Sequence, residues 1–183
     1  MVKDLHDDYF LWKSFKEGDD ESFSILYDRY ADNLYHYGMH FTRDKEFIKD
    51  CIHDLFLELH KYREKLSITD SIRFYLLRSL RRIIASKQTK PAVFFSGNIL
   101  QTMNGDQESS PEESIVASET EENKNNLLMK AMKNLTDQQR EVLSLKFEQT
   151  LSYSEISEIL GVSIESARTA VYRSIKLLRE SIQ

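Results

Sequence analysis

Apolar residues recur every three or four positions along most of the chain, the spacing that gathers side chains on one face of an α-helix. In the N-terminal half this spacing predicts helices over residues 20–41, 44–62 and about 70–88, preceded by a short helix around Trp12. No alternating pattern typical of a β-strand competes with it. We therefore expect this half to be an antiparallel helical bundle.

The same periodicity predicts which side chains the helices bury. Cys51 is the only cysteine, and it lies on the apolar face of the second long helix. We therefore expect a buried structural thiol rather than a nucleophile. The side chains expected on the core face of the first long helix are Phe23, Leu26, Tyr27, Tyr30, Leu34, Tyr37 and Phe41.

The C-terminal part carries the start and stop signals of a helix-turn-helix. Thr136 and Ser152 each stand three residues before a Gln or Glu, which is the spacing of a capping box. Gly161 stands where the chain must turn sharply, and Ser163 is placed to cap a last helix that runs to about Ile182. By itself this pattern predicts DNA binding of an unspecified kind.

Helix phase divides the last helix into two faces. The side chains expected to pack on the preceding helices are Ile164, Ala167, Val171, Ile175, Leu178 and Ile182. The side chains expected to reach DNA are Ser163, Glu165, Ser166, Arg168, Thr169, Tyr172, Arg173 and Lys176. Those near the start of the helix are expected at base edges, whereas Arg173 and Lys176 are expected to contact phosphate. The competing interpretation is a cationic helix that is simply solvated.

A segment of different composition, residues 91–126, joins the two halves. It contains both prolines, and its seven acidic residues outnumber a single lysine. We interpret it as a flexible acidic linker that either packs in part on a neighbouring domain or lies as an acidic arm in a basic channel of a partner. The expected fold is all-α, with two small domains at residues 1–90 and 127–183. Proteases should cut first between Pro91 and Asn125.

The formal net charge of −5 therefore arises in the linker. Residues 1–90 carry 16 basic and 16 acidic side chains, and residues 127–183 carry eight and seven. Because attraction to phosphate depends on the local field, the acidic total does not exclude nucleic acid. A single cysteine, a polar N-terminus and the lack of any run of about 18 apolar residues predict a soluble, intracellular (cytoplasmic) protein without membrane insertion.

A polar loop followed by a basic helix makes a candidate site for single-stranded nucleic acid in the N-terminal half. Cations there can follow phosphates, and the interleaved rings of Phe74 and Tyr75 suit unstacked bases. An equally good alternative is a solvated basic face with both rings in the core. The candidate residues are Lys65, Ser67, Thr69, Asp70, Ser71, Arg73, Arg78, Arg81 and Arg82.

His53 and Asp54, with His36 and His40 upstream, also fit the metal-dependent phosphohydrolases named for a His-Asp pair. However, His53 and Asp54 fall opposite the apolar face of their helix, and no convincing set of further ligands is present. We favour a solvated helix face, and therefore expect no metal, no cofactor and no catalytic residue.

Taken together, the two halves resemble the extracytoplasmic function (ECF) sigma factors, the smallest specificity subunits of bacterial RNA polymerase. The resemblance covers nearly everything except the linker. The helix-turn-helix alone is weakly specific, since response-regulator output domains share its pattern, but its pairing with this helical bundle is strongly specific. The matching segments are residues 11–12, 18–19, 23–30, 50–59, 140–143 and 145–147, followed by the helix-turn-helix.

This resemblance implies a role for each candidate surface. The polar face that contains Asp50, His53, Asp54 and Glu58 would dock on the coiled coil of the largest polymerase subunits. The loop at 65–71 and the basic helix after it would open the promoter and hold a flipped base of the non-template strand. The helix-turn-helix would read the minus-thirty-five element in the major groove. The implied partners are core RNA polymerase, promoter DNA and an anti-sigma factor.

Five positions depart from the usual pattern of the family. Arg82 and Ser86 stand where Asn and Asp are usual, His53 replaces Gln, and Thr136 replaces proline. Ala170 stands in the reading helix where arginine is common, which we interpret as the sharpest sign of an individual promoter preference. The main rival hypothesis is a stand-alone helix-turn-helix regulator, which would bind its operator tightly without polymerase.

Overall fold

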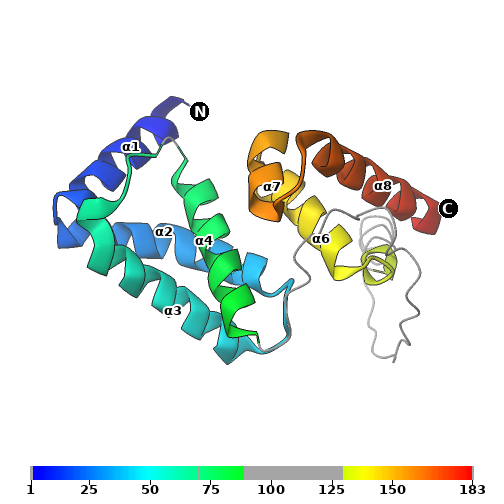
Figure 1. Cartoon of the computed structure of the whole chain (residues 1–183), viewed down its shortest axis with the longest axis horizontal. Helices are drawn as coiled ribbons and strands as arrows, with labels where there is room; N and C mark the ends of the chain where they lie inside the picture. The colour runs from blue at the N-terminus through cyan, green and yellow to red at the C-terminus, as the bar shows by residue number, and fades with distance from the viewer. Residues whose placement is uncertain (1, 70, 89–129, 183) are drawn as a thin grey trace, which may run out of the picture. The chain divides into compact units, whose positions relative to one another are not determined.

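The structure is a computed structural model that describes residues 2–69, 71–88 and 130–182, with side chains described from residue 8 to residue 181 within these ranges. All regular structure in these ranges is helical (Figure 1), which confirms the expected all-α class. The chain divides into two compact units, Met1–Ala92 and Val93–Gln183. The linker predicted over 91–126 lies outside the described residues, as does the choice between its two interpretations.

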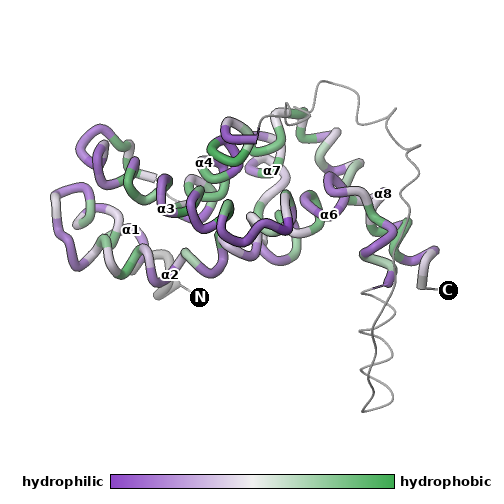
Figure 2. The backbone as a smooth tube through the Cα atoms, turned by 90° about the horizontal axis from the view of Figure 1, so that it is seen from below, coloured by the Kyte–Doolittle hydropathy of each residue, from purple (hydrophilic) through white to green (hydrophobic). Residues whose placement is uncertain are grey.

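In residues 2–69 and 71–88 the N-terminal unit contains four α-helices and one 3-10 turn. In chain order they are α1 (Val2–Lys16), α2 (Asp20–Gly38), α3 (Lys45–Tyr62), η1 (Arg63–Lys65) and α4 (Ile72–Lys87). The helices α2, α3 and α4 all pack on one another, and α1 packs on α2. Hydrophobic and hydrophilic stretches alternate along each helix, as the predicted periodicity requires (Figure 2).

Side-chain caps start three of these helices. Asp19 accepts a hydrogen bond from the backbone N–H of Ser22 at 2.9 Å, and a second bond from the Ser22 hydroxyl is the main cause that lowers the pKa of this carboxyl. Asp44 caps α3 and Ser71 caps α4 in the same way. Each cap satisfies a backbone N–H that has no partner inside the helix.

The core of this unit forms where the apolar faces of the helices meet. Cys51 is fully buried there, as predicted, and burial is the main cause that raises the pKa of its thiol. The expected core position of Tyr27 is wrong, because its side chain is 42% exposed. Its ring packs against Phe56 with centroids 4.8 Å apart, at the margin of the buried face. Periodicity located this face correctly but made it one residue too wide.

The C-terminal unit forms the predicted helix-turn-helix. From residue 137 onward its described elements are α6 (Asp137–Leu143), a π-helical turn η2 (Ser144–Glu148), α7 (Tyr153–Leu160) and α8 (Ile164–Ile182). The last helix, α8, packs on both α6 and α7. Gly161 has a φ of 70°, so the turn between α7 and α8 uses the left-handed conformation that glycine adopts without strain.

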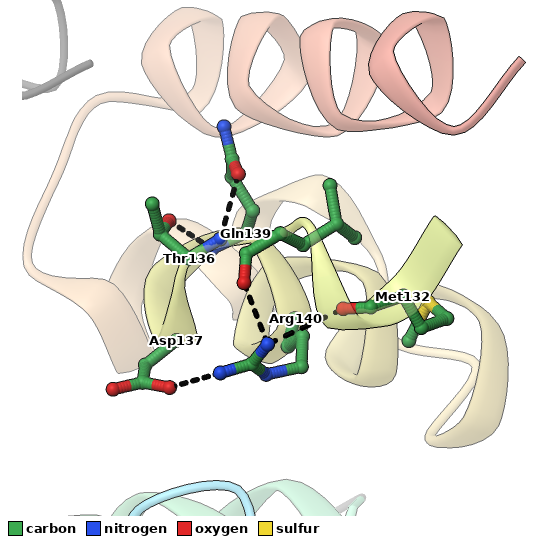
Figure 3. Close-up of polar contacts among 6 residues, drawn as sticks. Met132, Thr136, Asp137, Gln139 and Arg140 are labelled. Carbon is green, nitrogen blue, oxygen red and sulfur yellow. Dashed lines mark hydrogen bonds and ion pairs between the residues drawn. The ribbon is translucent and has the colours of Figure 1, made fainter. Parts of the chain in front are cut away.

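Both predicted capping boxes are present. The Thr136 hydroxyl accepts the N–H of Gln139 at 3.3 Å, and the Gln139 side chain accepts the N–H of Thr136 at 2.9 Å (Figure 3). Ser152 and Glu155 make the same reciprocal pair at the start of α7. In addition, Arg140 reaches back to donate to the carbonyl of Leu135 at 2.6 Å, which ties α6 to the segment before it.

The buried face of α8 differs from the predicted one. Ala167 and Val171 pack as expected, but Ile164 is 44% exposed, whereas Ala170 and Ser174 are buried. The small side chains at 167, 170 and 174 allow close approach to α6 and α7, and they turn the buried face toward Ala170 and away from Ile164. The expected packing of Ile164 is therefore wrong. The side chain of Ile182 lies outside the described ones.

No helix in the described part of the chain is both long enough and apolar enough to cross a bilayer.

Candidate functional site

The exposed face of α8 carries most of the side chains predicted to reach DNA. Tyr172 is 69% exposed, Arg168 and Lys176 are exposed, and Thr169 and Arg173 are partly exposed. Because these positions lie on the side opposite Ala167 and Val171, the helix can present them to a groove while its other face holds the unit together.

At the start of α8 the predicted base-reading side chains are already engaged within the helix. The Ser163 hydroxyl accepts the N–H of Ser166 at 3.1 Å and lies 2.8 Å from the Ser166 hydroxyl. Glu165 pairs with Arg168 at 3.0 Å. Contact of these groups with bases therefore requires that they exchange partners, and it stays a prediction.

The buried position of Ala170 changes its interpretation. Its side chain is only 8% exposed, and its carbonyl accepts a hydrogen bond from the buried Ser174 hydroxyl at 2.9 Å. Position 170 therefore belongs to the packing face of α8. The small residue sets how closely this helix approaches its neighbours, so the expected link between Ala170 and promoter preference stays a prediction without support from its position.

A cationic cluster at the start of α7 escaped the sequence interpretation. Two cations lie over the Tyr153 ring, with Lys146 Nζ 4.5 Å and the Arg168 guanidinium carbon 5.4 Å from its centroid. Lys146 also donates to the carbonyl of Leu151 at 3.1 Å. These residues come from η2, α7 and α8, so the residue spacing within any one helix could not predict the cluster. It places two positive charges beside the helix that approaches the DNA backbone in helix-turn-helix proteins.

The basic residues of α4 do not form one surface. Arg78 and Arg82 are one helical turn apart on an exposed face that Arg81 flanks, and Arg78 lies over the Phe74 ring at 6.0 Å. Arg73 instead lies near Tyr30 of α2. Burial, followed by a hydrogen bond to Asp8, raises the pKa of Tyr30 far above its ordinary value, and the charge of Arg73 opposes this shift.

The sequence left open whether the rings of Phe74 and Tyr75 suit unstacked bases or lie in the core, and the two rings differ in this respect. Both are half-buried, but Tyr75 packs against the buried Trp12 with centroids 5.5 Å apart, whereas Phe74 packs under Arg78. Of the two, Phe74 is thus the one that a base could approach beside a cation.

The loop before α4 is ordered by its own polar side chains. The Thr69 hydroxyl accepts the N–H of Ser71 and donates to the carbonyl of Ser71, each at 3.2 Å. Ser71 caps α4. Ser67 and Lys65 are exposed, and Lys65 Nζ lies 5.9 Å from the Tyr62 ring centroid. Asp70 lies outside the described residues.

On α3, the residues predicted to contact a partner form an exposed face, with one exception. Asp50, His53 and Glu58 are exposed, but Asp54 is partly covered and makes an ion pair with Lys87 near the end of α4. The hydrogen bond that Lys87 donates to Asp54 within this ion pair is the main cause that raises the pKa of Lys87. The helix phase suggested that Asp54 is simply solvated, but this carboxylate makes an ion pair with Lys87.

Leu57 lies among these polar residues and is 54% exposed. The sequence analysis missed it, although its position out of phase with the apolar face is a usable signal. His53 and Asp54 gather no third potential metal ligand within the described ranges.

Comparison with known proteins finds similarity to sigma factors along almost the whole chain. The family model described as Sigma-70, region 4 matches residues 125–178. The chain is 24% identical to the ECF RNA polymerase sigma factor SigX of Bacillus subtilis (strain 168) over 90% of its own length and 85% of that protein. It is 22% identical to SigW of the same strain, covering 93% of the chain and 94% of SigW. It is 26% identical to BldN of Streptomyces coelicolor over 88% of the chain but spans only 60% of that longer protein.

Two solved structures share the fold. One is CnrH in complex with the cytosolic domain of CnrY, with a TM-score of 0.62 and 16% identity over 94% of this chain and 95% of that one. The other is the sigma factor RpoE in complex with the anti-sigma factor NepR from Bartonella quintana, with a TM-score of 0.60 and 17% identity over 88% and 97%. The region 4 model thus matches the helix-turn-helix unit, and almost the whole chain is similar to proteins of a single kind, the ECF RNA polymerase sigma factors.

Proposed function

We propose that this protein binds core RNA polymerase and directs it to promoters, where α8 reads the upstream element and the N-terminal unit helps to open the DNA. The observation that carries the proposal is the presence, in one chain, of a region 4 helix-turn-helix and a second helical unit similar to the rest of an ECF sigma factor. A stand-alone regulator needs only the first of these. The protein then acts as a transcription initiation factor in the cytoplasm, without catalysis of its own.

The exposed face of α3 is the surface that we assign to core polymerase. Asp50, His53 and Glu58 surround the exposed Leu57, and an apolar centre with a polar rim is the usual composition of a protein interface. Asp54 contributes after it exchanges Lys87 for a partner on the polymerase.

The upstream element is assigned to the exposed face of α8 together with the cluster around Tyr153. Tyr172, Thr169 and Arg168 are positioned to reach the groove, and Arg173 and Lys176 to contact phosphate. Lys146 adds a positive charge from a neighbouring element. Such phosphate contacts make binding fall steeply as the salt concentration rises.

An anti-sigma factor is the further partner that we infer. The RpoE structure with the same fold contains the anti-sigma factor NepR, and a comparable inhibitor is expected for this chain. A protein of this kind should lower transcription that depends on the sigma factor without affecting transcription by the housekeeping holoenzyme.

Transcription with purified components tests the proposal directly. Core polymerase is incubated with bacterial genomic DNA, with and without this protein, and the 5′ ends of the transcripts are mapped. Specific start sites should depend on the protein, and the free protein should bind these promoters only weakly until core polymerase is added. If no start site depends on it, or if the free protein alone binds tightly, the stand-alone regulator becomes the better hypothesis.

The assignment of α8 predicts the effect of a single substitution. Arg173→Ala should weaken binding of the holoenzyme to a duplex of the upstream element by about 1–3 kcal/mol, because one contact to DNA is lost while α3 is unchanged. Arg179→Ala removes the same charge from the exposed last turn of α8 and serves as the control. Fluorescence anisotropy with labelled DNA and labelled core polymerase measures both affinities. Equal loss of DNA and core binding in Arg173→Ala would contradict the assignment.

A further inference from the structure

A hydrogen bond from α1, the first helix of the N-terminal unit, fixes the loop between η1 and α4. Trp12 Nε1 of α1 donates to the backbone carbonyl of Ser67 at 3.0 Å, across 55 positions of sequence. The described residues of this loop are 66–69 and 71, and they belong to the unit that the proposed function assigns to opening of the promoter DNA. The tryptophan that holds it belongs to no surface assigned so far.

Trp12 is a rigid donor. It is fully buried, and its ring packs against Phe15 and Tyr75 with centroid separations of 5.6 and 5.5 Å. An indole enclosed by other rings has no alternative rotamer available without opening a cavity. The carbonyl that accepts its N–H is therefore held at a fixed place relative to α1 and α4.

Other hydrogen bonds among the described loop residues lie close to the two ends of the loop. At the first end, the N–H of Leu66 donates to the carbonyl of Arg63 at 3.2 Å. At the other end, Thr69 and Ser71 bond to each other, and Ser71 caps α4. The peptide between Ser67 and Ile68 lies between these two anchors, and the hydrogen bond from Trp12 to the Ser67 carbonyl is its own anchor.

This anchor determines what the loop presents to solvent. A trans peptide directs its N–H opposite to its carbonyl, and the described chain contains no cis peptide. Because the Ser67 carbonyl points to Trp12, the N–H of Ile68 points away from the helices. The Ile68 side chain is 54% exposed at the same place. The loop thus presents one backbone donor and one apolar side chain side by side.

We propose that Trp12 is a positioning residue for promoter opening, and that it holds the loop so that Ile68 receives an unstacked base of the non-template strand. The backbone N–H of Ile68 bonds to an acceptor on the base edge, and the Ile68 side chain covers part of the base face. Lys65 is exposed at the start of the loop and can approach the adjoining phosphate. This inference rests on the proposed sigma-factor function and adds to it the residue that shapes the single-strand site.

Two variants of Trp12 and one of Ile68 test the inference in the reconstituted holoenzyme. The probe is a promoter fork, taken from a mapped start site, whose non-template strand is single-stranded over the melted segment. Trp12→Phe keeps an aromatic ring but removes the donor, and replacement of Trp12 by benzothienylalanine removes only the N–H. Loss of one hydrogen bond should weaken fork binding by about 2- to 10-fold. Ile68→Ala should weaken it by a similar factor, with unchanged affinity for core polymerase.

Leu34→Val provides the matched control for general loss of stability. Leu34 is buried in α2, and shortening its side chain lowers stability without touching the loop. It should leave fork binding within twofold of the wild-type value. Equal weakening by Leu34→Val and Trp12→Phe would overturn the positioning role, and so would normal fork binding of the benzothienylalanine protein. If the wild-type holoenzyme itself failed to bind the fork more tightly than core polymerase does, the proposed function would fail instead.

Discussion

At the scale of single residues, Gly38 shows how closely α2 and α3 approach. A Cβ at this position would lie 2.6 Å from Cγ2 of Ile48, inside any normal contact distance. Ile48 is itself fully buried and has no room to retreat. Gly38 is therefore required by packing, whereas Gly161 is required by its positive φ.

We predict that Gly38→Ala lowers the free energy of unfolding by about 1–3 kcal/mol, because it overpacks the contact between α2 and α3. Urea denaturation followed by circular dichroism measures this change. In the double variant that carries both Gly38→Ala and Ile48→Ala, removal of Cγ2 relieves the overlap. The loss of unfolding free energy in the double variant should therefore be smaller than the sum of the losses in the two single variants. Full additivity would show that the overlap is not the cause.

The single thiol supplies a second prediction at this scale. Burial raises the pKa of Cys51, so the thiolate fraction at pH 8 is smaller than in the unfolded chain. Native protein should therefore react with a disulfide reagent such as DTNB far more slowly than protein unfolded in urea. The stability from this neutral thiol is present below the unfolded pKa and is lost as the pH rises through the raised folded value. Fast stoichiometric labelling of native protein at pH 8 would contradict the burial.

At the scale of elements, the two faces of α3 differ in composition and burial. One face carries Cys51 and Leu55 into the core, and the other presents Leu57 among acidic residues. A leucine that is 54% exposed in the middle of a polar face buries only part of its apolar area in the free protein. Its burial against a partner would add apolar area to binding.

Leu57→Ala should weaken binding to core polymerase by about 1–2 kcal/mol and leave binding to the promoter fork unchanged once the holoenzyme is saturated. Ile68→Ala is a closely matched control, since both side chains are 54% exposed. It should show the reverse pattern. Competition assays with labelled sigma factor and purified core polymerase measure the first effect. Normal core affinity of Leu57→Ala would remove this residue from the interface.

At the scale of the whole molecule, the chain forms two compact units that each contain a core of their own. The division between Ala92 and Val93 falls inside the segment that the sequence marks as a linker. Limited proteolysis of the full chain should therefore cut first between Pro91 and Asn125 and release two resistant fragments, which mass spectrometry identifies. First cleavage within α2 or α8 would contradict this organisation.

The sequence by itself determined the helices, their caps and the helix-turn-helix. These features depend on local signals, such as the spacing of apolar residues, Thr136 and Ser152 as caps, and Gly161 in the turn, all of which the structure reproduces. Each signal acts within about one helical turn, so it can be read without knowing where the rest of the chain lies.

Only the tertiary structure decided how residues from different elements meet. It brought Trp12 into a hydrogen bond with Ser67 and Asp54 into an ion pair with Lys87. It also brought Lys146 and Arg168 over the ring of Tyr153. It also buried Ala170 and exposed Ile164. These outcomes depend on the distance and rotation at which helices pack, which follow from the shapes of all the contacting side chains together. Periodicity gives the direction of a helix face, but packing decides which residues at its margin are buried and which reach a partner.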